Sequence, residues 1–455
     1  MEAWTLTMSA EELFADFMVI SVLLLAGTIL RRYVRFFQRF LIPNSLIAGF
    51  LGLLLGSQLL DILPFAPERM GAWVYHLLAL TFISVGLYRT GDEHSFGAIN
   101  LGFMQVAVML LQGIVGLAVA LLTVMTLVPD FHPATGVLLP LGFAMGPGIA
   151  YTIGQSWTAF GFEGGGSLGL TVAAAGFLVA YFFGMILVNR AVGATGTKDT
   201  LPSHVRTGIL APGESMVGAR LTFSGAAVEP LTVHLALVGG IYMLTWLVTK
   251  GLGLLLVSGG LEKELPVLWS FHFIIANLLA IAVRKLVWGG KRGEWIDEGM
   301  VHRMTGSFAD YLIAASIMGI SMIFAWRFVL PLMLICLLGA WLTFRFVWWS
   351  CEKIFSTHRF ERFIGMFAQM TGTIASGLAL LRVTDPEYRS PVAQELVLSS
   401  GMAMGFGFPL LILINMPFTM FDGSLYGFAM LLGLMTAYLI LLVGAWIWYW
   451  KRKSS

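Results

Sequence analysis

Two glycine-rich segments of the sequence carry the residue types that could bind a small ionic solute. The first contains Met145-Gly146-Pro147-Gly148 and, further along the chain, Gln155. A Gly-Pro-Gly sequence stops a helix, and the free N–H groups at the start of a helix can hold a carboxylate. We therefore predict that the solute is bound by Gly146, Pro147, Gly148 and Gln155. The alternative is a packing corner between two short helices.

The second segment reads Met370-Thr371-Gly372-Thr373-Ile374-Ala375-Ser376-Gly377. Its hydroxyl oxygens, and the backbone carbonyls that Gly372 frees, form the hard oxygen shell that Na⁺ prefers. We predict that Thr373 and Ser376 bind sodium. Thr371 and Gly372 are predicted to contact the solute. The alternative is that each hydroxyl bonds to a carbonyl of its own helix, which is common in membrane helices.

Isolated polar residues inside apolar stretches extend both predicted sites. Burial of an uncompensated carboxylate is costly, so we predict a sodium ion near Asp310, with Asn277 as a second ligand. Asn415 and Arg382 are predicted to bind the solute carboxylate. The alternatives are a solvated Asp310 at the cytoplasmic rim, amides that bond between helices, and an Arg382 that anchors the chain at the membrane surface.

Residue patterns typical of enzymes do not occur in the predicted spans, which lack Ser-His, Cys-His, HExxH and paired-carboxylate arrangements. His76 and His272 lack the spacing of metal ligands and are predicted to be packing or interfacial residues. Cys336 and Cys351 indicate no disulfide framework. We expect no enzymatic activity and no cofactor, with Na⁺ as a coupling ion.

The composition places these segments in a helical membrane protein. Of 455 residues, 58 % are hydrophobic and 11 % are charged, and the mean hydropathy is +0.85. Apolar runs of about 20 residues recur along the chain, long enough to cross a hydrocarbon core of about 30 Å. The net charge of +2 does not indicate nucleic-acid binding, and the expected surroundings are membrane lipid.

The predicted fold class is an all-α polytopic membrane protein with about eleven transmembrane helices. The glycine-rich stretches 134–162 and 361–384 are predicted to be re-entrant loops, because irregular backbone is not tolerated against lipid. With the N-terminus outside, most of the 27 Lys and Arg residues, including Arg362, then fall on the cytoplasmic side of a cell inner membrane. The predicted spans are 14–30, 41–60, 71–88, 101–128, 167–189, 231–249, 266–283, 307–325, 328–349, 395–415 and 425–449.

The longest polar stretch, 191–230, is predicted to be a cytoplasmic linker between two halves. Residues 1–190 and 231–416 each contain five predicted spans and one re-entrant loop. An odd number of crossings puts the two halves in opposite orientations, which is the arrangement of inverted-repeat transporters. Residues 417–455 are predicted to add one C-terminal span and a basic tail.

Several local strings resemble the sodium/glutamate symporter family over about residues 14–416. They are Leu41-Ile42-Pro43-Asn44, Phe82-Ile83-Ser84-Val85-Gly86-Leu87 and the two glycine-rich segments. The resemblance implies two inverted five-helix units, re-entrant loops that meet from opposite faces, Na⁺-coupled uptake of glutamate, and a homodimer with an elevator-like motion. The chain departs from the family pattern at Met145-Gly146-Pro147-Gly148, where members have Gly-Gly-His-Gly, and at Ile412 to Ile414, where they have an acidic residue. H⁺ coupling through Asp310, another dicarboxylate or 2-oxo acid, and a passive channel remain alternatives.

Overall fold

A computed structural model describes residues 9–88, 96–195, 228–288, 296–385 and 390–454, which form helices and contain no strand. Seven of these helices are long and apolar enough to cross a membrane, or eight if one bent pair is a single span. The predicted class, an all-helical polytopic membrane protein, is therefore confirmed. The seven are Ala10–Tyr33, Phe96–Thr126, Gly165–Ala191, Pro230–Ser258, Val329–Ile354, Val392–Thr419 and Leu425–Arg452.

Four predicted spans fall on helices that are shorter, more polar or bent. The span predicted at 41–60 contains α3 (Asn44–Leu55), whose 12 residues rise only about 18 Å. The span predicted at 266–283 falls on α12 (Leu265–Ser270) and α13 (His272–Trp288), which belong to the bent pair. The other two fall on α4 (Pro67–Gly86) and α14 (Glu298–Met318), so the count of eleven stays a prediction.

The chain forms two compact units, and each combines segments from both predicted halves. Unit 1 consists of Met1–Leu30, Asn44–Gly91 and Leu210–Gly319. Unit 2 consists of Arg31–Pro43, Asp92–Ile209 and Ile320–Ser455. The boundaries predicted from the sequence therefore do not separate the spatial units. The predicted linker, 191–230, lies for the most part outside the described residues.

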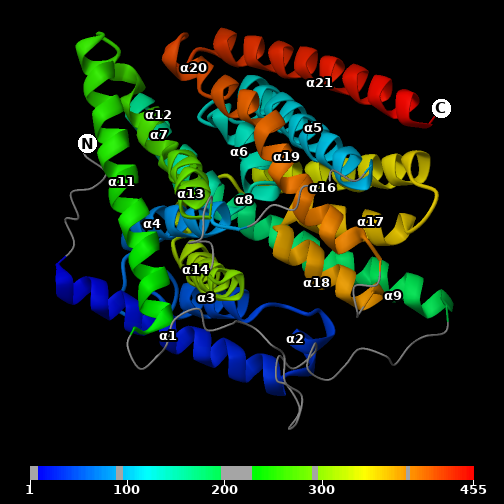
Figure 1. Cartoon of the computed structure of the whole chain (residues 1–455). Helices are drawn as coiled ribbons and strands as arrows, with labels where there is room; N and C mark the ends of the chain where they lie inside the picture. Colours follow the sequence, from blue (N-terminus) through cyan, green and yellow to red (C-terminus); the bar gives the residue numbers. More distant parts are fainter. Residues whose placement is uncertain (1–8, 89–95, 196–227, 289–295, 386–389, 455) are drawn as a thin grey trace. The chain divides into compact units, whose positions relative to one another are not determined.

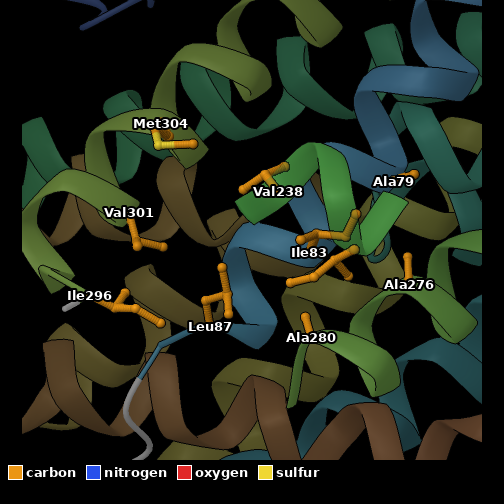
Figure 2. Packing of buried hydrophobic residues seen from close by; sticks show 10 residues of the cluster. Ala79, Ile83, Leu87, Val238, Ala276, Ala280, Ile296, Val301 and Met304 are labelled. Atoms are coloured by element: carbon orange, nitrogen blue, oxygen red, sulfur yellow. The ribbon is translucent and has the colours of Figure 1, made fainter. Parts of the chain in front are cut away.

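Unit 1 is built around α4, which packs along both α13 and α14. α14 also packs on α3, and α11 (Pro230–Ser258) packs on α13, while α1 (Ala10–Tyr33) begins the unit. Small residues allow α4 and α13 to approach closely, because a Cβ at Gly86 would lie 2.8 Å from the backbone oxygen of Asn277. Figure 2 shows the apolar cluster that α4, α11, α13 and α14 share, including Ile83, Val238 and Ala280.

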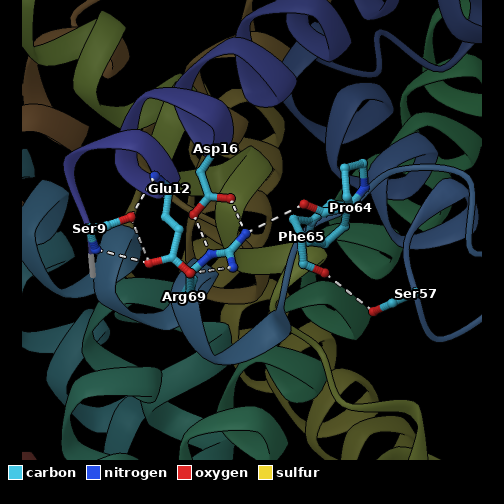
Figure 3. A network of polar contacts seen from close by, with 7 residues as sticks. All are labelled: Ser9, Glu12, Asp16, Ser57, Pro64, Phe65 and Arg69. Atoms are coloured by element: carbon cyan, nitrogen blue, oxygen red, sulfur yellow. Dashed lines mark hydrogen bonds and ion pairs between the residues drawn. The ribbon is translucent and has the colours of Figure 1, made fainter. Parts of the chain in front are cut away.

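An ion-pair network ties the start of α1 to the start of α4 (Figure 3). Asp16 is fully buried and accepts two hydrogen bonds from Arg69, at 2.8 and 2.9 Å. Ser9 and Glu12 bond reciprocally through side chain and backbone N–H, which is a capping box that begins the helix. The Arg69 guanidinium therefore compensates a carboxylate that would be costly to bury alone.

Unit 2 is built around α5 (Phe96–Thr126), which packs against α6, α16, α19 and α21. Figure 1 shows α21, in red, beside α5, in cyan. The bounds of the remaining helices are α2 (Arg35–Arg39), α6 (Ala134–Phe143), α7 (Pro147–Ser156), η1 (Trp157–Phe160), α8 (Gly165–Leu178), η2 (Val179–Phe183), α9 (Gly184–Thr195), α15 (Met322–Arg327), α16 (Val329–Ile354), α17 (Arg359–Thr371), α18 (Ile374–Thr384), α19 (Val392–Leu413), α20 (Met416–Thr419) and α21 (Leu425–Ser454).

Side-chain contacts give the directions of the long helices of unit 2. Phe131, just after α5, packs on Phe328, just before α16, so α16 begins where α5 ends and runs antiparallel to it. The N-terminal half of α5 instead contacts the N-terminal part of α19, because Gln105 donates to Ser399 at 2.7 Å. α19 therefore runs in the same direction as α5. These directions define two opposite ends of α5, from which the elements of the candidate site enter.

Candidate functional site

The first glycine-rich segment forms a hairpin of two short helices, α6 and α7. Gly146 adopts a φ of 93°, a left-handed conformation that glycine adopts without strain, and Pro147 then begins α7. The two ends of the hairpin lie together, because His132 before α6 stacks on Phe162 after α7 with ring centroids 4.5 Å apart. Since Phe131 packs at the junction of α5 and α16, the base of this hairpin lies at the C-terminal end of α5.

The second glycine-rich segment forms a hairpin from α17 and α18, broken at Gly372 and Thr373. The two helices pack closely at Gly377, where the absence of a side chain is required. A Cβ there would lie only 2.6 Å from the backbone oxygen of Gly365. The base of this hairpin lies at the N-terminal end of α5, where Arg362 pairs with Glu395 beside Gly97. The two hairpins therefore enter unit 2 from opposite ends of α5.

The tips of the two hairpins meet. A Cβ at Gly146 would lie 3.5 Å from Cγ2 of Thr373, which is ordinary van der Waals contact. Gly146 and Thr373 are the N-cap residues of α7 and α18, and neither provides a side-chain cap. The first N–H groups of both helices therefore lack intrahelical partners at one place, and both helix dipoles present their positive ends there. Such an arrangement can bind an anionic group.

The three hydroxyls of the second hairpin differ in their partners. Thr371 donates to the carbonyl of Phe367 at 2.9 Å, and Ser376 donates to the hydroxyl of Tyr181 at 3.2 Å. Tyr181 lies in η2, a π-helical turn, a feature that occurs frequently at functional sites. The Thr373 hydroxyl oxygen, by contrast, is buried and has no hydrogen-bond partner among the described residues. Of the three, Thr373 retains a hydroxyl that could bind a ligand.

Two glutamines that the sequence analysis did not include in the site lie at the second hairpin, Gln112 on the neighbouring helix α5 and Gln369 within α17 itself. Gln112 of α5 is fully buried and donates to the backbone oxygen of Met370 and to Thr343, each at 2.9 Å. Its side-chain oxygen has no partner among the described residues, and neither has that of Gln369. A glutamine inside an apolar run is the signal that could have indicated Gln112.

Three predicted solute ligands lie away from the tips. Gln155 and Arg382 each follow the first residue of their helix by eight positions, a rise of about 12 Å. Asn415 lies near the base of the first hairpin, where it accepts a hydrogen bond from the Trp157 indole at 2.8 Å. Its amide nitrogen donates to the carbonyl of Leu411. The structure therefore brings together Gly146, Pro147, Gly148, Thr371, Gly372, Thr373 and Ser376, but not these three residues.

Two predicted sodium ligands belong to unit 1. Asp310 lies half-buried on α14. Asn277 is buried on α13 and donates to the carbonyl of Phe82 on α4 at 2.8 Å. This contact is the interhelical hydrogen bond that the sequence offered as the alternative for the intramembrane amides. Sodium binding by either residue remains a prediction.

The bases of the two hairpins are held by different forces. Aromatic rings hold the first, because His132 stacks on both Phe162 and Phe418, and its Nδ1 accepts a hydrogen bond from the backbone N–H of Ala134. Burial lowers the pKa of His132 to about 4. A buried ion pair holds the second, with Arg362 donating twice to Glu395. The Arg362 side chain is buried against that carboxylate.

Comparison of the chain with models of known protein families, with curated proteins and with solved structures finds no match.

Proposed function

We propose that the protein is a secondary active transporter that couples entry of Na⁺ to uptake of a small carboxylate such as glutamate. The observation that carries this proposal is the meeting of two uncapped helix N-termini at Gly146 and Thr373, on hairpins that enter from opposite ends of α5. Broken helices whose half-helix ends face one another are the usual construction of a solute site in carriers.

The anion would lie against the N–H groups of α7 and α18. Pro147 has no N–H, so Gly148 and Ile149 supply the donors of the first helix, and Ile374 and Ala375 those of the second. In a membrane, interrupted backbone of this kind is tolerated where protein buries it or where it lines a watery cavity. A solute carboxylate would therefore satisfy backbone groups that lipid could not satisfy.

The coupling ion would lie on the oxygen side of the same tips. The Thr373 hydroxyl and the Gln112 side-chain oxygen are buried acceptors without a partner among the described residues. Na⁺ is a hard cation that oxygen ligands suit, and the carbonyls at the ends of α6 and α17 carry partial negative charge. Bound Na⁺ would add positive charge next to the helix N-termini and thereby strengthen binding of the anion.

The packing supports inverted repeats with eleven spans as part of the proposal. α5 and α16, the fourth predicted span of each half, run antiparallel and lead into opposed hairpins. In unit 1, α3, the second predicted span of the first half, packs on α14, the third span of the second half. In the same way α13, in the second span of the second half, packs on α4, the third span of the first half. A two-fold relation between the halves would produce this exchange. Residence in the cell inner membrane, an external N-terminus and a homodimer complete the proposal.

The decisive experiment is uptake of labelled glutamate into proteoliposomes with an imposed inward Na⁺ gradient. Matched vesicles carry a K⁺ gradient or a pH gradient instead. We expect the vesicles to concentrate glutamate only when the Na⁺ gradient is imposed, and not with the K⁺ or pH gradient. Uptake that follows the pH gradient would replace Na⁺ by H⁺ as the coupling ion, and flux that never concentrates the solute would indicate a channel. No uptake of glutamate under any gradient would reject this substrate and lead to a binding screen of other small carboxylates.

A matched pair of variants tests the ion site. Thr373→Val removes the hydroxyl without a partner, whereas Thr171→Val removes one that donates to the carbonyl of Ser167 within α8. We expect Thr373→Val to raise the Na⁺ concentration for half-maximal uptake at least tenfold, with Thr171→Val close to the wild type. An equal response of the two variants would contradict the proposed ion site.

A further inference from the structure

A cluster of arginines follows the lipid-facing part of α1. Residues 17–60 contain no acidic residue, and their four basic residues all fall within 31–39. They are Arg31, Arg32, Arg35 and Arg39. The last three are exposed, and none of these three has an ion pair with a residue that the structure describes. The segment 31–40, here called the arginine turn, therefore presents positive charge that the described part of the protein does not neutralise.

The bend at the start of the arginine turn is held by a side chain of the turn itself. α1 ends at Tyr33, and Val34 adopts an extended conformation with φ −95° and ψ 111° before α2 begins. The side-chain nitrogen of Gln38 reaches back and donates to the carbonyl of Arg32 at 2.6 Å. This bond satisfies a carbonyl that the end of α1 leaves without an intrahelical partner. The arginines therefore lie on a fixed turn.

Aromatic packing fixes the arginine turn to unit 2. The rings of Phe36 and Phe40 pack on Phe182 of η2, with ring centroids 5.8 and 4.8 Å apart. Arg35 and Arg39 also lie four positions apart, so they are neighbours on the surface of α2. Both are exposed, whereas the phenylalanine pair is in contact with the protein. α2 therefore holds two guanidinium groups side by side and facing outward.

The exposed apolar stripe of α1 places the arginine turn at the depth of the lipid headgroups. The residues of this stripe follow at intervals of three or four positions and are 57 to 71 % exposed. They are Phe14, Met18, Val22, Leu25, Ile29 and Tyr33. From the first to the last of them α1 rises about 28 Å, close to the hydrocarbon thickness of about 30 Å. The arginine turn therefore begins where the surface suited to acyl chains ends.

We propose that the arginine turn is a binding site for the headgroup of an anionic phospholipid. A guanidinium group donates two parallel N–H bonds to phosphate oxygens, and arginines next to a membrane span attract anionic lipid. Tyr33 and Phe36, which are 71 and 49 % exposed, place aromatic surface beside these groups at the level where headgroups and acyl chains meet. The site thus matches both parts of a phospholipid.

Charge argues against a second copy of the chain as the occupant of the arginine turn. A two-fold contact brings the same patch of both copies together, so the arginines of one copy would face those of the other. Like charges placed opposite one another across an interface repel. An anionic headgroup instead supplies the negative charge that the turn lacks.

The test is native mass spectrometry of the purified full-length protein in detergent, titrated with phosphatidylglycerol or with zwitterionic phosphatidylcholine. We expect phosphatidylglycerol to bind about tenfold more tightly. The triple variant Arg32→Gln, Arg35→Gln and Arg39→Gln should lose this preference. Equal affinity of the wild type for the two lipids would overturn the proposal, and this outcome needs no variant.

A matched triple variant controls for the loss of positive charge. Arg190→Gln, Arg303→Gln and Arg345→Gln together remove three exposed arginines that lie outside the arginine turn. This control should keep the preference for phosphatidylglycerol. An equal loss of preference in the two triple variants would mean that general charge attracts the lipid, and would overturn the site. A change of oligomeric state in the first triple variant, without lipid preference in the wild type, would assign the surface to a second copy instead.

Two further arms keep the test decisive. If the glutamine triple variant does not insert, replacement of Arg32, Arg35 and Arg39 by lysine keeps the positive charges that orient the chain. We expect this variant to bind phosphatidylglycerol more weakly, because an ammonium group lacks the two-pronged geometry of a guanidinium, and unchanged binding would overturn the proposal. Glycerol 3-phosphate at the concentration of the lipid should not displace it. Displacement would identify a free phosphate compound as the ligand and overturn the lipid site.

The lipid site is independent of the proposed transport function. No residue of the arginine turn belongs to the tips of the two hairpins at Gly146 and Thr373. Lipid binding is measured without solute or ion gradient. Absence of lipid preference would therefore leave the transport proposal unchanged, and absence of glutamate uptake would leave the lipid site unchanged.

Discussion

The two hairpins of unit 2 have the same outline but are secured in different ways. The first turns at Gly146 with a left-handed φ, and uncharged aromatic rings around His132 hold its base. The second turns at Gly372 and Thr373, and a buried ion pair between Arg362 and Glu395 holds its base. Similar broken-helix geometry therefore rests on packing at the base of one hairpin and on charge at the base of the other. The two ends should therefore fail under different perturbations.

The largest effect is expected at the charged base. Arg362→Met leaves the Glu395 carboxylate buried without its partner, which costs about 3 to 5 kcal/mol of unfolding free energy. The double variant Arg362→Met with Glu395→Leu removes both charges and should recover most of the loss. Unfolding in mixed micelles measures both variants.

The chain offers a matched control for this prediction. Arg327 and Asp130 form an ion pair with exposed side chains, 57 % and 75 % accessible, so Arg327→Met should cost less than about 1 kcal/mol. Equal losses from Arg362→Met and Arg327→Met would mean that burial of the pair contributes nothing to the second hairpin.

The aromatic base should instead respond to acid. The pKa of His132 is about 4 in the folded protein against about 6.5 unfolded, so the unfolded state binds more protons between these values. Stability should therefore rise with pH in this window, with His132 costing up to about 2 kcal/mol near pH 5. The difference between the wild type and His132→Phe, measured by unfolding at several pH values, isolates this contribution. A pH dependence that is unchanged in His132→Phe would contradict the assignment.

The first tip can be tested through its backbone. Gly146→Ala places a side chain at a φ of 93°, which should cost about 1 to 2 kcal/mol in stability. Gly161 has nearly the same φ of 91° with no atom near a built Cβ, so Gly161→Ala should cost a similar amount. Only Gly146→Ala should weaken solute binding, measured by calorimetry with glutamate. If Gly146→Ala and Gly161→Ala bind glutamate equally well, the turn at Gly146 is not part of the solute site.

The helix breaks were predictable from sequence because their causes are local. Gly-Pro-Gly at 146–148 and Gly372 interrupt apolar runs, and the structure breaks its helices at both places. The ion pair was not predictable, because Glu395 meets Arg362 and Gly97 only after distant helices pack. The roles of Gln112 and Asn415 likewise depend on partners more than 200 residues away. Residue type indicates what a side chain can do, and packing decides which partner it has.

The smallest effect on stability is expected where the two tips meet. The Thr373 hydroxyl has no hydrogen-bond partner among the described residues, so Thr373→Val removes a buried polar group that nothing satisfies. We expect the unfolding free energy of this variant to equal that of the wild type or to exceed it. Thr371→Val removes a hydroxyl that bonds to Phe367, and should cost about 1 kcal/mol. If Thr373→Val instead cost more than Thr371→Val, the Thr373 hydroxyl would have a structural role and would not be a group kept for a ligand.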